Sequence, residues 1–178
     1  MRGHPVEFGA MRVAHVRSPF LGRSETFLYG YVANHQRYLP VVIAEYLENA
    51  HQFPVEEAIV HRSGPYRHEA MLDRCRSMLF DWHSRELVFR AFYRRALASG
   101  RFDVAHFHFG PPAVRLCHLA GGMPVVVSFY GYDLSQVPHR YGLDFYQRTG
   151  LFGAATLVTA EGRHAAACLT RLDRKSVV

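Results

Sequence analysis

Two histidines two positions apart, His106 and His108, are the residues whose types and spacing most directly suggest chemistry. They lie in a run of β-branched and aromatic residues, where alternation puts both on one face of a strand and Phe107 and Phe109 on the other. One interpretation is a metal pair, because imidazole is a common ligand of transition metals. The other is a polar rim of neutral imidazoles that hydrogen-bond to sugar hydroxyls or phosphates. We favour the rim, because no further ligand falls at a recognisable spacing, and keep a metal-dependent hydrolase as the alternative.

The elements that position these histidines are predicted to be a strand, a helix and a second strand. The first strand covers residues 103–110, and a short helix over residues 113–120 follows it. Residues 123–129 form an apolar run that is too continuous for a half-exposed strand and is typical of a parallel sheet covered on both faces. Residues 130–133 are expected to form a loop. Both strands therefore deliver polar groups at their carboxyl ends, where open α/β sheets bind ligands.

The rest of the chain alternates in the same way, which predicts an α/β fold. We expect a Rossmann-like parallel sheet of about six or seven strands with helices on both faces. A loop is expected at residues 135–140. Further strands are predicted at residues 11–17, 39–44, 55–61 and 156–160, and further helices at residues 24–36, within 68–101, at 143–152 and before Leu172.

Composition narrows the class of protein. The chain has 178 residues, of which 49% are hydrophobic, so one domain with a sizeable core is expected. No apolar run reaches the roughly 18 residues of a membrane-spanning helix. The three cysteines are odd in number and widely spaced, which predicts reduced, buried thiols in a cytoplasmic protein. The net charge of +6 favours anionic partners but does not choose among them.

The first helix could offer an anion site. Ser24 is placed to cap it and Glu25 falls in its first turn, after a loop that contains Gly22. A helix that follows a strand in this way can turn its N-terminus toward a phosphate. The loop has one glycine where a dinucleotide fingerprint needs three, and the sequence contains no phosphate-binding loop of the glycine-lysine-serine type.

A basic stretch precedes the central unit. Arg85, Arg90, Arg94 and Arg95 crowd a predicted helix that also carries aromatic residues. Such a helix could lie on an anionic membrane surface. A solvated helix packed on the sheet is the simpler interpretation, and we favour it.

Four segments in order resemble the N-terminal domain of glycosyltransferase family 4, the retaining enzymes with the GT-B fold. The first is residues 20–27, with Ser-Glu-Thr-Phe at its end, and the second is residues 103–110. The third is residues 124–133, which contain Tyr-Gly-Tyr-Asp, and the fourth is Thr-Ala-Glu-Gly at residues 159–162. Together they extend over nearly the whole chain.

The resemblance implies the acceptor-binding half of an enzyme that transfers a sugar from a nucleotide-sugar donor to a polysaccharide or lipid-linked acceptor. It implies neither a metal nor another cofactor, no nucleic acid partner, and a cytoplasmic protein that could be peripheral on the inner face of the plasma membrane. Tyr130 replaces a histidine of many family members. A phenol is a poor base near neutrality, so we expect it to position substrate. The implied residues are Gly22, Ser24, Glu25 and Thr26 in the loop toward the donor phosphates and the acceptor, His106, His108, Gly131 and Glu161 on the acceptor side, and Tyr130 and Asp133 at the catalytic position.

The GT-B fold has a second Rossmann-like domain, which holds most contacts with the nucleotide sugar and a pair of glutamates. We see no such half in this sequence and therefore expect the chain alone to be inactive. Residues 1–10 are expected to be a flexible extension and residues 11–172 the domain. Residues 173–178 resemble a translated sequencing adapter, so we expect them to be non-native. A non-catalytic nucleotide-binding module is a further alternative.

Overall fold

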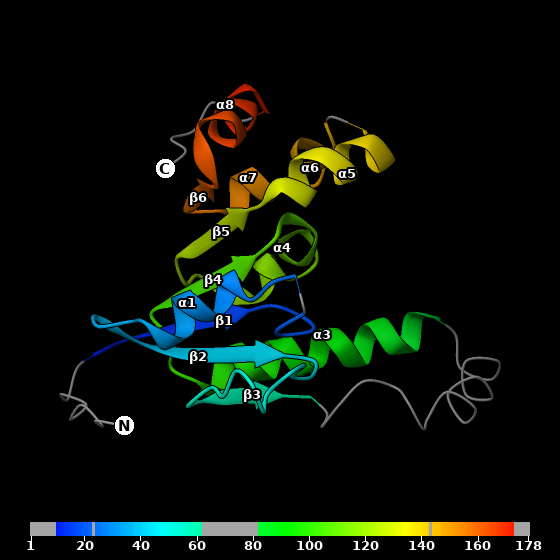
Figure 1. Ribbon diagram of the computed structural model, residues 1–178. Helices are drawn as coiled ribbons and strands as arrows, with labels where there is room; N and C mark the ends of the chain where they lie inside the picture. Colours follow the sequence, from blue (N-terminus) through cyan, green and yellow to red (C-terminus); the bar gives the residue numbers. More distant parts are fainter. Residues whose placement is uncertain (1–9, 23, 62–81, 143, 173–178) are drawn as a thin grey trace.

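The computed structural model describes residues 10–22, 24–61, 82–142 and 144–172. Six parallel strands form one sheet in the order β3-β2-β1-β4-β5-β6 (Figure 1). This confirms the predicted α/β, Rossmann-like fold. The strands are β1 (Met11–Val16), β2 (Tyr38–Ala44), β3 (Ala58–Val60), β4 (Val104–His108), β5 (Val125–Phe129) and β6 (Leu157–Ala160).

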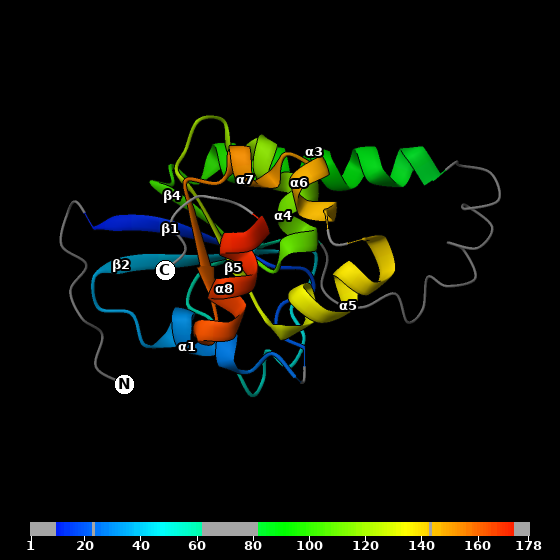
Figure 2. The same cartoon turned by 90° about the horizontal axis from the view of Figure 1, so that it is seen from above.

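Helices lie on both sides of the sheet, with α1 on one side and α3 on the other (Figure 2). Helices α1 and α3 each lie in a connection between two strands that run in the same direction, as a parallel sheet requires. None of the described helices is long and apolar enough to cross a membrane. The helices are α1 (Phe27–Ala33), α3 (Trp82–Ser99), α4 (Gly110–Leu116), the 3-10 helix η1 (Cys117–Ala120), α5 (Gly131–Tyr141), α6 (Phe145–Arg148), α7 (Leu151–Ala154) and α8 (Gly162–Leu172).

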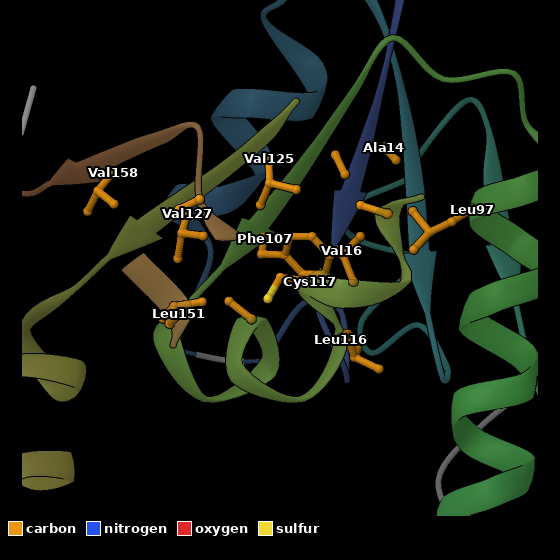
Figure 3. Packing of buried hydrophobic residues seen from close by; sticks show 14 of the residues in the cluster. Ala14, Val16, Leu97, Phe107, Leu116, Cys117, Val125, Val127, Leu151 and Val158 are labelled. Carbon is orange, nitrogen blue, oxygen red and sulfur yellow. The ribbon is translucent and has the colours of Figure 1, made fainter. Parts of the chain in front are cut away.

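The main core lies between the sheet and the layer that contains α3 and α4. Alternation along β4 sends Ala105 and Phe107 into this core, where both are fully buried. Figure 3 shows Phe107 among Val16, Val127 and Cys117. Cys117 is buried as predicted and burial raises the pKa of its thiol, whereas Cys168 is half-buried. Cys75 lies outside the described residues.

The opposite face of the sheet carries the histidines and is covered by α1. Its smaller core contains Leu28 and Val32 of α1, together with Phe109 and Tyr130. Phe109 was expected beside Phe107 on the other face, and this expectation is wrong. Its φ of 74° places it in the left-handed region that side chains rarely adopt, so the backbone turns and the ring moves to the α1 side.

Three predicted elements differ from the structure. Helix α1 begins at Phe27 instead of Ser24, because the preceding residues form backbone turns in which Glu25 N–H donates to the Gly22 carbonyl. Residues 131–141 form helix α5, where loops were expected, because the Asp133 carboxylate accepts from Tyr130 N–H at 3.0 Å and caps the helix start. The helix expected at residues 143–152 is two short ones, interrupted at Gly150, which has a φ of 70°.

The basic stretch is a helix packed on the sheet, as favoured, for the part that the structure describes. Tyr93, Ala96 and Leu97 of α3 are buried in the main core. The predicted helical residues before Trp82 and the side chain of Arg85 lie outside the described part.

Candidate functional site

A row of polar side chains crosses the α1 face of the sheet near the carboxyl ends of the strands. The register places His15 of β1 beside His106 of β4, and His108 beside Ser128 of β5. Ser128 in turn lies beside Thr159 of β6. Because neighbouring residues in register point to the same face, these five side chains share one surface. The predicted delivery of polar groups to this edge is confirmed.

A cavity of about 440 Å³ opens at this edge. Phe27 and Tyr31, one helical turn apart on α1, form an aromatic wall with Tyr130. The Phe27 and Tyr130 ring centroids are 4.8 Å apart. Hydroxyl groups and one carboxylate supply the polar lining. The lining residues are Phe27, Tyr31, Ser128, Phe129, Tyr130, Thr159, Ala160 and Glu161.

The hydroxyl groups of the cavity are held in place by hydrogen bonds. Ser128 Oγ lies 2.7 Å from His106 Nε2 and 2.6 Å from Thr159 Oγ1. The imidazole of His106 is half-buried and in edge contact with the Tyr31 ring, at 5.8 Å between centroids. This network extends from β4 to β6 and fixes the polar side of the cavity.

The two predicted histidines are joined by a third, His15. One ring nitrogen of each of His15, His106 and His108 lies within 4.8 Å of the others, so the three could hold a metal ion. His15 and His108 are fully buried. Burial lowers the pKa of His15 to about 3 and that of His106 to about 4, and it lowers the pKa of His108 well below its ordinary value. All three imidazoles are therefore neutral at pH 7.

The imidazoles form specific contacts. His15 Nδ1 lies 2.9 Å from His108 Nε2, and the two rings are nearly parallel, at 14°. His108 Nδ1 lies 3.0 Å from the hydroxyl oxygen of Tyr130. A buried hydrogen-bonded chain thus leads from β1 through β4 to the cavity wall.

Tyr130 and Asp133, predicted at the catalytic position, have different surroundings. The Tyr130 side chain lines the cavity, and burial raises the pKa of its phenol further above its ordinary value. Asp133 is fully buried, and burial raises its pKa to about 7. One carboxylate oxygen caps α5, and Oδ1 has no hydrogen-bond partner among the described residues.

The first loop lies beside the same edge. Arg17, directly after β1, forms an ion pair with Glu25, and its guanidinium carbon lies 4.4 Å from the centre of the Phe109 ring. Glu25 Oε2 accepts from Arg17 Nε at 3.0 Å, so the guanidinium of Arg17 is already paired. Ser24 and Thr26 are exposed, and Gly22 lies against Glu25.

The remaining residues that were predicted on the acceptor side are Gly131 and Glu161. Gly131 is exposed at the first position of α5, directly after Tyr130. Glu161 is exposed between β6 and α8 and contributes to the cavity lining. The structure therefore brings Tyr130 and Glu161 to one cavity, with His106 and His108 behind it.

No family model matches the sequence, and no curated protein matches it. Among solved structures, the chain is similar to the UDP-GlcNAc 2-epimerase from Methanocaldococcus jannaschii, with a TM-score of 0.56 and 10% sequence identity. The similarity covers 94% of this chain and 45% of that one, so this chain spans less than half the length of the epimerase. At this identity the likeness concerns the fold, which is that of a GT-B-like, Rossmann-like α/β domain.

Proposed function

We propose that this chain is the acceptor-binding half of a retaining glycosyltransferase similar to family 4. The full enzyme would transfer a sugar from a nucleotide-sugar donor to a polysaccharide or lipid-linked acceptor. The observation that carries the proposal is the cavity at the carboxyl edge of the sheet, with aromatic rings on one side and hydroxyl groups and Glu161 on the other. The fold supports it, because the similar solved structure is named for an enzyme that acts on UDP-GlcNAc.

The chemistry of the lining fits a sugar. Phe27 and Tyr31 offer flat apolar faces on which the C–H face of a pyranose can pack. The carboxylate of Glu161 accepts hydrogen bonds from sugar hydroxyls, and the hydroxyls of Ser128 and Thr159 can donate or accept. A volume of about 440 Å³ is within the range of small-molecule sites.

Within this proposal the residues have separate roles. Tyr130 and Glu161 orient the acceptor, and His108 holds the Tyr130 phenol from behind. Asp133 is a positioning residue, because its carboxylate caps α5 and is buried away from the cavity. The first loop, with Gly22, Ser24, Glu25 and Thr26, faces the donor diphosphate. In such a reaction cationic side chains and helix N-termini stabilise the leaving diphosphate, so the proposal involves no metal.

A metal-dependent hydrolase remains the second candidate, and the third histidine specifically favours it. His15, His106 and His108 together supply the three imidazoles of a zinc site. Against this, the facing nitrogens of His15 and His108 are 2.9 Å apart and hydrogen-bonded to each other, and Tyr130 occupies the other His108 nitrogen. An ion bound at both facing nitrogens would have to replace the first of these hydrogen bonds. We therefore prefer the sugar site.

An anionic membrane surface is a further proposed partner. Arg94 and Arg95 are exposed on α3, and Leu87 and Val88 are exposed nearer its start. Arg90 instead hydrogen-bonds to His118. Phe89, an aromatic residue of the same helix, packs against the core under the guanidinium of Arg115. The proposed membrane contact therefore rests on Arg94 and Arg95.

Binding of sugars by the cavity tests the proposal. A panel of monosaccharides and nucleotide sugars is offered to the chain, and contact is followed by saturation-transfer NMR. We expect Tyr31→Ala and Glu161→Gln to weaken binding roughly tenfold, which corresponds to about 1.4 kcal/mol. Tyr141→Ala is the matched control, because Tyr141 is similarly exposed and lies outside the cavity lining. Equal binding by all variants would contradict the assignment of the cavity.

A further inference from the structure

The buried chain of His15, His108 and Tyr130 has a direction that the structure allows to be assigned. Two hydrogen bonds connect the three side chains, at 2.9 Å and 3.0 Å. A neutral imidazole has one N–H donor and one bare nitrogen, so each histidine can donate only once. The proton positions in both hydrogen bonds are therefore fixed by one tautomer, that of His15.

The unpartnered nitrogen of His15 decides between the two possible arrangements. His15 Nε2 is buried and has no hydrogen-bond partner in the part of the chain that the structure describes. If Nε2 carried the proton, a donor would be buried without an acceptor. If Nδ1 carries it, only a lone pair is left unpaired. Unpaired buried N–H groups are the rarer of the two among backbone groups, and we extend this preference to the imidazole.

We infer that His15 donates from Nδ1 to His108 and that His108 donates from Nδ1 to the Tyr130 oxygen. The Tyr130 proton therefore points away from both histidines and is available as a hydrogen-bond donor to a ligand in the cavity. Tyr130 lines the cavity beside Tyr31 and Ser128, and both of these side chains interact with its phenol. Its proton is therefore directed to the cavity side, where a ligand oxygen would compete with these two hydroxyl groups.

The consequence is a rule for the ligand. A Tyr130 hydroxyl that already accepts from His108 favours a partner that brings an acceptor oxygen, such as a ring, glycosidic, carboxylate or phosphoryl oxygen. In the opposite arrangement the Tyr130 hydroxyl would donate to His108 and would favour a ligand that brings a donor hydroxyl. The ligand rule rests on the proposed function, because it takes the cavity as the sugar site. The assignment of the tautomers does not depend on the proposed function.

The tautomers can be measured directly in the intact chain. Histidine is labelled with ¹⁵N, and long-range ¹H–¹⁵N spectra identify which ring nitrogen carries the proton. The signals are assigned with His15→Asn, His15→Leu and Tyr130→Phe, and exposed His139 and His164 serve as internal references. We expect Nδ1 to be protonated in both His15 and His108. A proton on His108 Nε2 would overturn the inference.

Two variants test the rule that assigns the tautomers. Tyr130→Phe removes the acceptor of the His108 Nδ1–H, so either arrangement then leaves one buried N–H unpaired, and His108 should pass to a mixture of tautomers. His15→Leu leaves only a lone pair on His108 Nε2 unpaired as long as Nδ1 carries the proton, so the Nδ1 tautomer of His108 should persist. A changed tautomer in folded His15→Leu, or a single unchanged tautomer in Tyr130→Phe, would contradict the inference.

Two further arms complete the test. For sugars bound by the chain, Tyr130→Phe should weaken binding of a ligand with an acceptor oxygen about 2- to 12-fold, the range of a neutral hydrogen bond of about 0.5–1.5 kcal/mol. Methyl glycosides, sugar acids and sugar phosphates distinguish the sources of that oxygen. Zinc is titrated separately, and stoichiometric shifts of all three imidazoles would show a metal site in place of the hydrogen-bonded chain. Failure of every sugar to bind would contradict the proposed function and the ligand rule, and would leave the tautomer result standing.

Discussion

Gly110 lies directly against the ring of Tyr146, so closely that a Cβ atom at Gly110 would come within 2.5 Å of a ring carbon. Gly110 ends the His-Phe-His-Phe-Gly segment and starts α4, and Tyr146 is almost fully buried. The Tyr146 hydroxyl donates to the Asp133 carbonyl at 3.3 Å. The contact therefore couples the end of β4 to helix α5, which Asp133 caps.

Replacing Gly110 should disturb this contact. We expect Gly110→Ala to lower the free energy of unfolding by about 1–3 kcal/mol, because a buried aromatic ring would have to move. Gly131→Ala is the matched control, since a Cβ there meets nothing within 4 Å. Urea denaturation of both variants measures the difference. Similar stability losses in the two would contradict the described packing.

Asp133 should make stability depend on pH. Its folded pKa of about 7 lies above the ordinary 3.8, so the folded state keeps a proton that the unfolded state has lost. The free energy of unfolding therefore falls as pH rises from about 4 to about 7, by at most about 4 kcal/mol at about 1.4 kcal/mol per pKa unit. Asp133→Asn removes this dependence and keeps an acceptor for Tyr130 N–H.

The comparison must be made between variants. Lowered pKa values of the buried histidines act in the opposite direction, because their contribution to stability is lost as pH falls below about 6.5. The difference between the parent chain and Asp133→Asn cancels that contribution. Asp144→Asn, at an exposed carboxylate, is the control. A difference curve that is flat between pH 4 and 7 would refute the assignment.

The paired charge of Arg17 leads to a prediction about phosphate binding. Glu25 neutralises the guanidinium at the edge that is proposed to face the donor diphosphate. Glu25→Gln should free this cation and tighten pyrophosphate binding roughly tenfold, or about 1.4 kcal/mol, measured by calorimetry. Glu57→Gln frees Arg12 at the start of β1 and is the control. Equal affinities in the two variants would remove the first loop from the donor site.

The exposed arginines of α3 lead to a prediction about membranes. Arg94→Glu combined with Arg95→Glu should abolish binding to vesicles that contain anionic lipid, and binding by the parent should fall with salt. Arg163→Glu with Arg171→Glu on α8 changes the net charge equally. Sedimentation with vesicles measures both pairs. Equal binding to neutral vesicles, or equal loss in both pairs, would leave α3 as a packed helix only.

Much of the architecture could be predicted from local sequence, because β1, β4 and β5 coincide with distinct runs rich in aliphatic and aromatic residues. His15 could not be chosen in this way, since only the parallel register of β1 with β4, about 90 residues later, places it beside His106. A hypothesis of adjacent parallel strands would have singled it out as the polar residue of β1 on the histidine face.

Two further misses have local causes. Helix α5 was missed because the Tyr-Gly-Tyr-Asp segment at its start is typical of a loop. Asp133, three residues after the N-cap residue Tyr130, is nevertheless a signal for the start of a helix. The position of Phe109 depends on a positive φ, which no propensity of phenylalanine indicates. Contacts of the Phe109 ring with the Arg17 guanidinium and the Tyr130 ring hold the residue in this unfavourable backbone conformation.

The most direct test of the account is sugar transfer itself. Nucleotide sugars and candidate acceptors are offered to the longer protein that the proposal requires, to the same protein with Tyr31→Ala or Glu161→Gln, and to this chain alone. The account predicts acceptor-dependent release of the nucleotide by the longer protein, a loss of roughly tenfold in the cavity variants, and none by this chain. Turnover by this chain alone at a comparable rate, or transfer that both cavity variants leave unchanged, would contradict it.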